Sequence, residues 1–587
     1  MLRNYINYLS ALCTFLLLVA CGGGAGPGGA SGDCLLLATC SASATLPATP
    51  LSRPANFNAR QLAKSASSYA IYYGALDAAT IQTLQTYPLV IVHPYDGNIT
   101  RSQIQALQVG SSAAGTSQSV VVLCYISIGE DSRTFGLSNA QLLADPRFVG
   151  DGTGPSVDPR GTGVSTRALT GVNPIGTPTN SGFASWYMND NATYNTSAPV
   201  NVPDENPNFL TRYVNAGDPK WYDVINNELT DAAVPVGYQR NPPGLKEMLS
   251  TNYGRGLGCD GVFLDTMDTA APNYFASTVS NFEWTAQGFT NFIAKLRTDY
   301  PDSVILQNRG VFFFDPRQPQ YDVSARGNID LLLFESYRMD SDSSNIYNSN
   351  YFPDNKFNYA PKIMAEANRS DGFSVVSLDY GNGSAGNKPG IDIDTLVGTA
   401  TAGFSEFITD IQESLSVGFK PYITDAQVQL VNNFVKINAP LATALPLRWS
   451  STYNANPGSA TTVASAPAPR VGVQAVTVAG TSVTLSWDVA LAVTRVGYTL
   501  YYQTTPFNFS ADPHLSAATH IALTPTAGAG YSQAWNNATP DAALQSVYPY
   551  EQTISNLATG NTYYFVVRAH DSAGNEEQNQ TVLSATL

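Results

Sequence analysis

Eight short apolar segments between residues 68 and 424 constrain the fold of this 587-residue chain most strongly. They are 68–74, 88–96, 119–130, 259–265, 302–308, 329–336, 373–381 and 418–424. Helical patterns separate most of them, for example at 77–87, 219–233 and 289–300. Apolar strands that alternate with helices are typical of a parallel sheet covered on both faces. Eight such units predict an α/β fold, a (β/α)₈ TIM-like barrel; a doubly wound sheet, the alternative, rarely reaches eight repeats.

Two of these segments run directly into an acid. In "GCDGVFLDTMD" (258–268) an apolar run ends on Asp265, and in "NIDLLLFESYRMD" (328–340) another ends on Glu335. A carboxylate there is costly unless it is paired, hydrogen-bonded or used. Helix capping explains one of the two easily and both poorly. Because strand carboxyl ends meet at one mouth of a barrel, we expect the pair to face each other there, as acid/base hydrolysis requires.

Further polar and aromatic residues follow the predicted strands and are candidates for substrate binding. They are Tyr73, Asp96, Tyr125, Glu130, Asp268, Asn308, Tyr337, Asp379 and Tyr380. Each also has a structural explanation, since a Tyr in this position often packs in a core and an Asp often caps a helix. Asp268, which precedes "TAA", fits a cap best, and His93, which precedes a proline, fits a turn.

Four motifs resemble glycoside hydrolase family 114. They are "YISIGE" (125–130), "GCDGVFLDTMD", "ILQNRG" (305–310) and "LLLFESY" (331–337). The family consists of endo-α-1,4-polygalactosaminidases with a barrel fold. The resemblance implies cleavage of galactosamine-containing polysaccharide of biofilm matrix, with the family's two acids at Asp265 and Glu335. The family's Lys-Asn pair appears here as Gln307–Asn308, so the amide is kept and the cation is not.

Two carboxyl groups across a glycosidic bond suffice for its hydrolysis. We assign Asp265 as the nucleophile, because a strand-end Asp is short and rigidly placed. Glu335 is assigned as the acid/base and needs a raised pKa to hold a proton at neutral pH. Acids at the ends of next-but-one strands should stand roughly 5–5.5 Å apart, which predicts retention of configuration.

A long segment separates the third and fourth predicted strands. Residues 131–217 exceed an ordinary crossover and predict an elaborated insertion on the catalytic face. Only 218–233 resembles the covering helix. The aromatic residues of this region are candidates for sugar-stacking platforms, with core packing as the alternative. They are Trp186, Tyr187, Tyr194 and Trp221.

The C-terminal part of the chain changes character. After the barrel domain (56–450), a Pro/Ala/Ser/Thr-rich linker (451–470) leads into period-two segments (471–587) that predict a small all-β sandwich. This part resembles a fibronectin type III domain. The residues that carry the resemblance are Trp487, Tyr498, Leu557, Gly560, Thr562, Tyr563, Phe565, Val567 and Ala569.

The N-terminal segment is typical of a signal peptide. Residues 1–21 have one basic residue and an apolar run that ends in "LVAC", which resembles a bacterial lipobox with Cys21 as the lipidated residue. A flexible tether (22–55) follows. We expect a lipid-anchored protein of the outer membrane or cell surface, which meets the membrane through that anchor alone; plain secretion is the alternative. Of the remaining cysteines, Cys124 and Cys259 fit buried free thiols.

The charge excludes some partners. A net charge of −15 argues against nucleic acid and suits a cationic ligand such as a partly deacetylated amino sugar, or solubility alone. No metal-ligand spacing occurs among the four His and six Cys, so we expect neither a metal nor another cofactor. Two rivals to a hydrolase remain: a non-catalytic carbohydrate-binding lipoprotein, and an adhesion protein whose sandwich does the binding.

Overall fold

The computed structural model describes residues 53–587 with several gaps. These are 96–97, 162–168, 170, 192–198, 273–280, 316–320, 322, 341–351, 353–354, 382–403, 438–446, 450–469, 493–495, 524–525, 528–547 and 549. The predictions made for Cys21, Asp96 and Tyr194 therefore fall outside the described residues, as do those for the tether up to residue 52 and for nearly all of the linker.

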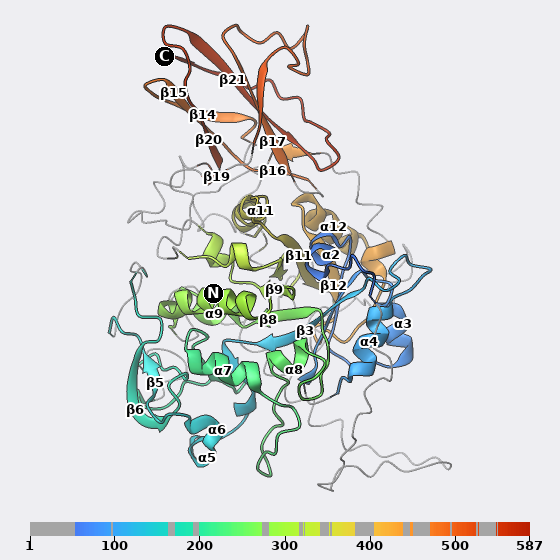
Figure 1. Ribbon diagram of the computed structural model, residues 1–587, viewed down its shortest axis with the longest axis vertical. Coiled ribbons are helices and arrows are strands. Elements are labelled where there is room, and N and C mark those ends of the chain that lie inside the picture. Colours follow the sequence, from blue (N-terminus) through green and yellow to red (C-terminus); the bar gives the residue numbers. More distant parts are fainter. Residues whose placement is uncertain are drawn as a thin grey trace.

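An eight-stranded parallel sheet forms a nearly closed barrel, which confirms the predicted fold class (Figure 1). Each strand lies within one of the eight apolar segments. In spatial order they are β1 (Ala70–Tyr72), β2 (Leu89–Val92), β3 (Val121–Ser127), β8 (Gly261–Asp265), β9 (Val304–Asn308), β10 (Leu331–Glu335), β11 (Ser374–Tyr380) and β12 (Lys420–Thr424). Beyond the sheet ends, the Tyr73 amide donates to the Val428 carbonyl at 2.7 Å and links the first and last strands.

Helices cover the barrel because their apolar residues recur on one side. They are α2 (Ala59–Ser65), α3 (Ala78–Leu84), α4 (Arg101–Val109), α7 (Pro219–Asn227), α8 (Leu245–Leu249), α9 (Ala286–Asp299), α11 (Ala360–Ala367) and α12 (Phe404–Ser416). In α9 the buried residues include Phe289, Phe292, Ile293 and Leu296, which is helical spacing. No helix in the described ranges is long and apolar enough to cross a membrane.

The burial pattern of two strands changes at the carboxyl end of the barrel. In β8 and in β10, four buried residues are followed by one partly exposed residue, Asp265 and Glu335 respectively. Both carboxylates therefore stand where the dry interior meets solvent, at the carboxyl end of the sheet. This is the end of a barrel at which active sites are built.

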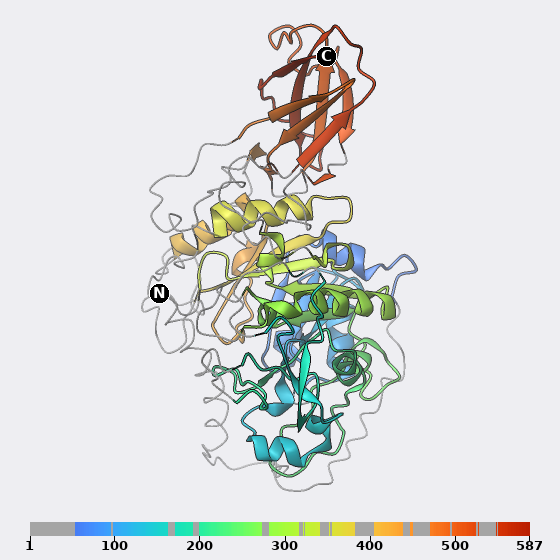
Figure 2. The same ribbon diagram turned by 90° about the vertical axis from the view of Figure 1, so that its left-hand side faces the viewer.

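The long insertion forms a small layer of its own, shown in teal at the end of the molecule opposite the sandwich in Figures 1 and 2. Its elements are β4 (Glu130–Asp131), α5 (Asn139–Ala144), α6 (Pro146–Val149), β5 (Gly154–Val157), β6 (Thr177–Phe183) and β7 (Arg212–Tyr213). Strand β4 pairs with β7, and β5 pairs with β6, both antiparallel. Trp186, Tyr187 and Trp221 are buried in the core, so the structure corrects their prediction as sugar-stacking platforms.

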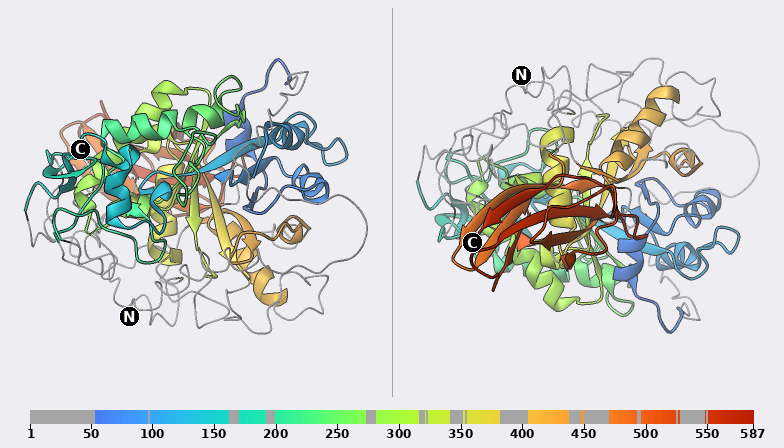
Figure 3. Two further views of the ribbon diagram at one scale, coloured as in Figure 1. Left: turned by 90° about the horizontal axis from the view of Figure 1, so that it is seen from below. Right: turned by 90° about the horizontal axis from the view of Figure 1, so that it is seen from above.

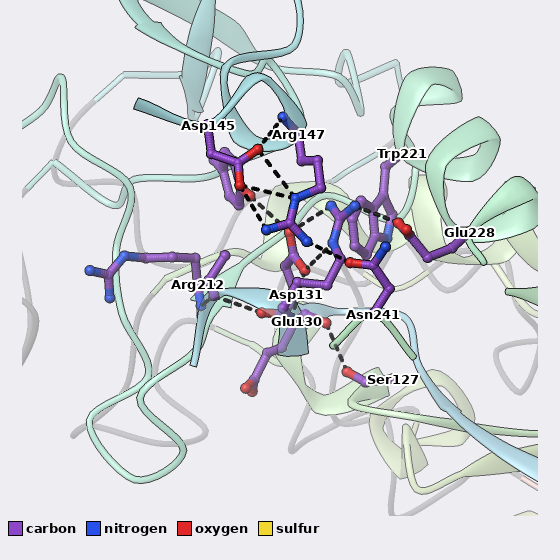
Figure 4. A network of polar contacts seen from close by, with 12 residues as sticks. Ser127, Glu130, Asp131, Asp145, Arg147, Arg212, Trp221, Glu228 and Asn241 are labelled. Atoms are coloured by element: carbon purple, nitrogen blue, oxygen red, sulfur yellow. Dashed lines mark hydrogen bonds and ion pairs between the residues drawn. The ribbon is translucent and has the colours of Figure 1, made fainter. Parts of the chain in front are cut away.

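An ion pair joins the insertion to the end of α7, and a hydrogen bond joins it to the segment between α7 and α8 (Figure 4). The guanidinium of Arg133 donates to Asp131 at 2.8 Å and also pairs with Glu228, which caps the end of α7. Arg147 of α6 pairs with Asp145 at 2.7 Å and donates to Asn241 at 2.6 Å. Removing one partner of such a buried pair leaves an uncompensated charge, so the network holds the insertion in one arrangement.

A disulfide joins Cys124 of β3 to Cys259, just before β8, with their Cα atoms 6.1 Å apart. This corrects the interpretation of both residues as free thiols. Their strands are neighbours in the sheet although they are 135 residues apart in the chain. The bond therefore closes a loop of the chain that contains the whole insertion.

Removing this disulfide should destabilise the protein. Closing a loop of 135 residues is worth roughly 3–5 kcal/mol when it restricts only the unfolded chain. We expect the double variant Cys124→Ala/Cys259→Ala to lose about that much free energy of unfolding in urea titrations. Reductant should lower the parent to the same value and leave the variant unchanged. Alkylation of Cys124 in unfolded, unreduced protein would contradict the assignment.

Two four-stranded antiparallel sheets form the C-terminal sandwich. One has the order β14 (Val473–Ala479), β15 (Ser482–Trp487), β20 (Tyr550–Ile554), β19 (Thr526–Ala527), and the other β18 (Thr519–Leu523), β17 (Gly497–Gln503), β21 (Thr562–His570), β22 (Leu583–Thr586). Trp487, Tyr498 and Phe565, which carry the sequence resemblance, are fully buried between the sheets. Membership of the fibronectin type III family stays a prediction.

The sandwich lies over α11, at the end of the molecule opposite the insertion (Figure 1, Figure 3). Strand β13 (Arg448–Trp449) pairs with β16 (Ala490–Leu491), and Tyr550 Oη donates to the Ala365 carbonyl of α11 at 2.7 Å. The guanidinium of Arg369 lies 5.4 Å from the Tyr550 ring centre. These contacts hold the sandwich against α11 and against the segment that follows β12.

Candidate active site

One amide joins the two predicted carboxylates. Strand β9 lies between β8 and β10, and its last residue, Asn308, donates from Nδ2 to Asp265 Oδ1 at 2.7 Å and to Glu335 Oε2 at 2.9 Å. Those two oxygens are therefore at most about 5.6 Å apart, the sum of the two hydrogen-bond lengths. The structure thus brings Asp265, Asn308 and Glu335 together at one point of the mouth.

Two tyrosines hold the remaining carboxylate oxygens. Tyr125 of β3 donates from Oη to Asp265 Oδ2 at 2.7 Å, and Tyr380 of β11 donates from Oη to Glu335 Oε1. Each carboxylate is thereby oriented by neutral donors from the strands on either side of it. This arrangement fixes both acids without neutralising either of them.

The electrostatic surroundings of Glu335 change the pKa of its carboxyl group. Burial raises the pKa of Glu335, and the nearby charge of Asp265 raises it further. The hydrogen bonds from Tyr380 and Asn308 and the charge of Arg309 oppose this rise in the pKa. On balance these surroundings favour the protonated form of Glu335.

Left-handed backbone turns follow both Asp265 and Asn308. Thr266 has φ 64° and Arg309 has φ 53°, values that are uncommon for residues other than glycine. The Thr266 hydroxyl accepts from the Gly129 amide at 2.7 Å, and a Cβ on Gly129 would come within 2.4 Å of the Thr266 carbonyl oxygen. Gly129 therefore allows the close approach that locks the turn after Asp265.

A wall of aromatic rings flanks Asp265. The His93 ring centre lies 4.9 Å from that of Tyr73, 4.4 Å from Tyr95 and 4.5 Å from Tyr125. Burial lowers the pKa of His93 to about 4, so this ring is neutral at physiological pH. His93 and Tyr95 were not among the predicted substrate-binding residues. Both lie within the second apolar segment just after β2 ends at Val92, and this position was the signal that could have identified them.

Glu130 is buried beneath the insertion, and its carboxylate is held by residues of the insertion. Its carboxylate accepts hydrogen bonds from Asn206 Nδ2 at 2.8 Å and from the Thr211 hydroxyl. Burial raises its pKa to about 7, and the Asp265 charge contributes to the rise. The structure therefore gives Glu130 the role of connecting the insertion to the barrel, in place of the predicted contact with substrate.

The Glu130 pKa predicts a pH-dependent stability. Because the folded pKa of about 7 exceeds the ordinary 4.5, folding favours the protonated form. This contribution is complete below pH 4.5 and is lost as the pH rises through about 7. At 1.36 kcal/mol per pKa unit it amounts to roughly 3 kcal/mol.

Between pH 4.5 and about pH 8, the parent should lose about 3 kcal/mol of unfolding free energy through this carboxyl group, and Glu130→Gln should not. The difference in unfolding free energy between variant and parent should therefore change by about 3 kcal/mol in favour of the variant. Urea titrations at both pH values measure this. Asp231→Asn, at an exposed ion pair with Arg240, serves as the control and should run parallel to the parent. Parallel behaviour of Glu130→Gln would contradict the buried, proton-binding carboxyl.

Two predicted substrate-binding residues lie away from the mouth. Tyr337 is fully buried, with its ring packed against Phe334 and Phe419 at 5.6 and 5.1 Å between centres. Asp379 is also buried and accepts from the amides of Arg338 and Met339 at 2.7 and 2.8 Å. Both belong to the outer side of the sheet, where they support the segment after Glu335.

Asp268 lies beside Asp265 and Glu335 and forms an ion pair with Arg309. It belongs to the first turn of a short 3₁₀ helix (Met267–Ala270) and does not cap it. Its Oδ2 accepts from Arg309 Nε at 2.6 Å, and its Oδ1 accepts from the Gly310 amide at 3.1 Å. In the part of the chain that the structure describes, no three His, Cys, Asp or Glu side chains group so as to hold a metal ion.

Comparison with known proteins gives distant matches only. No family model and no curated protein matches the chain. The glycoside hydrolase domain of PelA from Pseudomonas aeruginosa is similar over 62% of this chain and 98% of its own, with 14% identity and a TM-score of 0.34. An alpha-amylase from Geobacillus thermoleovorans, complexed with acarbose, covers 88% and 99%, with 10% identity and a TM-score of 0.32. Both neighbours are glycoside hydrolases, but at these scores substrate and reaction have to be inferred from the geometry of this chain's own residues.

Proposed function

We propose that this chain is a retaining glycoside hydrolase that cleaves α-linked, galactosamine-containing polysaccharide. The observation that carries the proposal is the single Asn308 amide that bonds both Asp265 and Glu335. It limits their facing oxygens to about 5.6 Å of each other. Retaining enzymes hold their carboxyls about 5–5.5 Å apart, whereas inverting enzymes need about 6.5–9.5 Å to admit a water molecule.

The roles follow from the surroundings of each acid. A carboxylate oxygen of Asp265 bonds to the anomeric carbon while the glycosidic C–O bond breaks and the Glu335 proton moves to the leaving oxygen. Ionised Glu335 then takes a proton from water, whose oxygen displaces Asp265 from the anomeric carbon. The raised pKa of Glu335 supports its part as the acid, since it has to be protonated when the first step begins.

The choice of substrate rests on the sequence resemblance and on charge. The four motifs that resemble family 114 enzymes include both acids and Asn308. A net charge of −15 would attract a polymer with free amino groups, and the neutral ring wall of Tyr73, His93 and Tyr125 offers apolar faces for sugars.

A panel of polysaccharides tests the proposal. The soluble protein is incubated with polymers of galactosamine, N-acetylgalactosamine, glucosamine and neutral hexoses, and new reducing ends are counted. We expect release from galactosamine-containing polymer above all others. Binding to that polymer with no new reducing ends would instead favour a carbohydrate-binding lipoprotein.

We also propose that lipidated Cys21 anchors the protein to the outer membrane or cell surface, where such a polymer is found. The support is the "LVAC" sequence at 18–21. Cys21→Ala should move the protein from the membrane fraction to the soluble fraction of the producing cells. A variant that fractionates like the parent would contradict the anchor.

A further inference from the structure

Family 114 enzymes carry a lysine before their strand-end Asn, and this chain has Gln307 at that position. The cationic side chain close by is that of Arg309. Gln307 occupies the family's Lys position and pairs in register with Leu264 and Leu332 of the neighbouring strands. Residues in register point to the same side of a sheet, so Gln307 faces away from Asn308 and the mouth. Its Nε2 donates to the carbonyl of Arg309 at 2.9 Å and supports the left-handed turn there.

This turn directs Arg309 toward both catalytic loops. Its Nε donates to Asp268 Oδ2 at 2.6 Å, and its Nη1 donates to the main-chain carbonyl of Glu335. The Gly310 amide donates to the other oxygen of Asp268. One guanidinium thus ties the loop after Asp265 to the backbone of Glu335.

We propose that Arg309, held by Asp268, is a positioning residue that fixes the backbone and the protonation of Glu335 in the hydrolysis proposed above. The planar fork of an arginine can bind a carboxylate and a carbonyl at once, which the single ammonium of a lysine does less well. The inference rests on the proposed function for its catalytic meaning. The contacts themselves do not depend on that function.

The charges around Glu335 give the direction in which its pKa should shift when Arg309 is replaced. The titratable and charged groups that face it are Asp265 on β8, Arg309 after β9, Tyr380 on β11, and Tyr69 and Tyr73 on either side of β1. The Asp265 charge raises the pKa of Glu335 and the Arg309 charge lowers it. Removing the cation should therefore raise the Glu335 pKa further and keep Glu335 protonated to higher pH.

The test compares Arg309→Gln and Arg309→Lys with Arg240→Gln, which removes an exposed arginine from the surface ion pair with Asp231. The Glu335 carboxyl is titrated by ¹³C NMR in glutamate-labelled protein and assigned by the loss of its signal in Glu335→Gln. We expect Arg309→Gln to raise this pKa. It should also shift the alkaline limb of kcat/KM to higher pH and lower kcat roughly ten- to a hundredfold. Arg309→Lys should keep the pKa near that of the parent and lose part of kcat, and Arg240→Gln should change neither.

The NMR readout separates this inference from the proposed function. An unchanged Glu335 pKa in folded Arg309→Gln would overturn it, whatever the activity. If Arg309→Gln does not fold, Asp268→Asn releases the guanidinium from its anchor and should lower kcat while Glu335 still titrates; parent-like kcat in that variant would overturn the positioning role. A shifted pKa in a protein that cleaves no polymer would refute the proposed function and leave the role of Arg309 toward Glu335 supported.

Discussion

Asp265→Ala should lower kcat by a factor on the order of 10⁴ or more, because it removes the atom that bonds to the anomeric carbon. The side chain is partly exposed at the end of β8, so water can replace it as acceptor for Tyr125 and Asn308. We therefore expect circular dichroism and the unfolding midpoint to stay close to those of the parent. Asp231→Ala, at a surface ion pair, provides a matched loss of one carboxylate and should keep full activity.

Residual activity within a factor of about ten of the parent would exclude Asp265 as the nucleophile. A folded but inactive variant that still binds polymer would support the assignment. Loss of both folding and activity would refute the expectation that the carboxylate is dispensable for the fold.

Glu335→Ala should lower kcat on natural polymer by about 10³ or more, because no other group would protonate the leaving oxygen. The loss should be much smaller on a substrate whose leaving group is already a weak base, such as a nitrophenolate. Azide should then accelerate turnover of that activated substrate, since it replaces the deprotonated water in the second step and cannot replace the acid in the first. Rates with both substrates, with and without azide, measure this.

The same azide experiment on Asp265→Ala serves as the contrast. Rescue in Asp265→Ala but not in Glu335→Ala would mean that the two acids have exchanged roles. No rescue in either variant, together with equal losses on both substrates, would contradict an acid/base role for Glu335.

The barrel could be predicted from sequence because each of its strands is buried on both sides. Such strands are continuous apolar runs that end where a polar residue appears. Both the strands and their carboxyl ends could therefore be located in the sequence. Asp265, Asn308 and Glu335 fell on neighbouring strand ends for that reason. Their proximity follows from the strand order of a barrel and required no side-chain detail.

Which way a strand-end residue faces was harder to predict. Along β11, Asp379 and Tyr380 are adjacent in sequence, yet Asp379 binds backbone amides behind the sheet and Tyr380 donates to Glu335. Side chains alternate between the faces of a strand, so a shift of one residue decides between a site residue and a supporting one. The polar pattern of this segment did not fix that register.

The sequence located the insertion but did not predict the contacts that its residues make. Sequence placed aromatic residues in it, and the structure uses Trp186 and Tyr187 as its core. The partners of Glu130 and of Cys124 come from segments 76 or more residues away. Contacts over such distances depend on the tertiary fold, which no local pattern of the insertion encodes.

The anomeric form of the first product tests the central claim, that Asp265 and Glu335 act together at close range, most directly. Cleavage of an α-linked galactosamine oligomer is followed by ¹H NMR in the first minutes, before mutarotation mixes the forms. The separation of at most about 5.6 Å between the facing oxygens predicts that the α-anomer appears first. Initial release of the β-anomer would mean inversion and would contradict a covalent intermediate on Asp265.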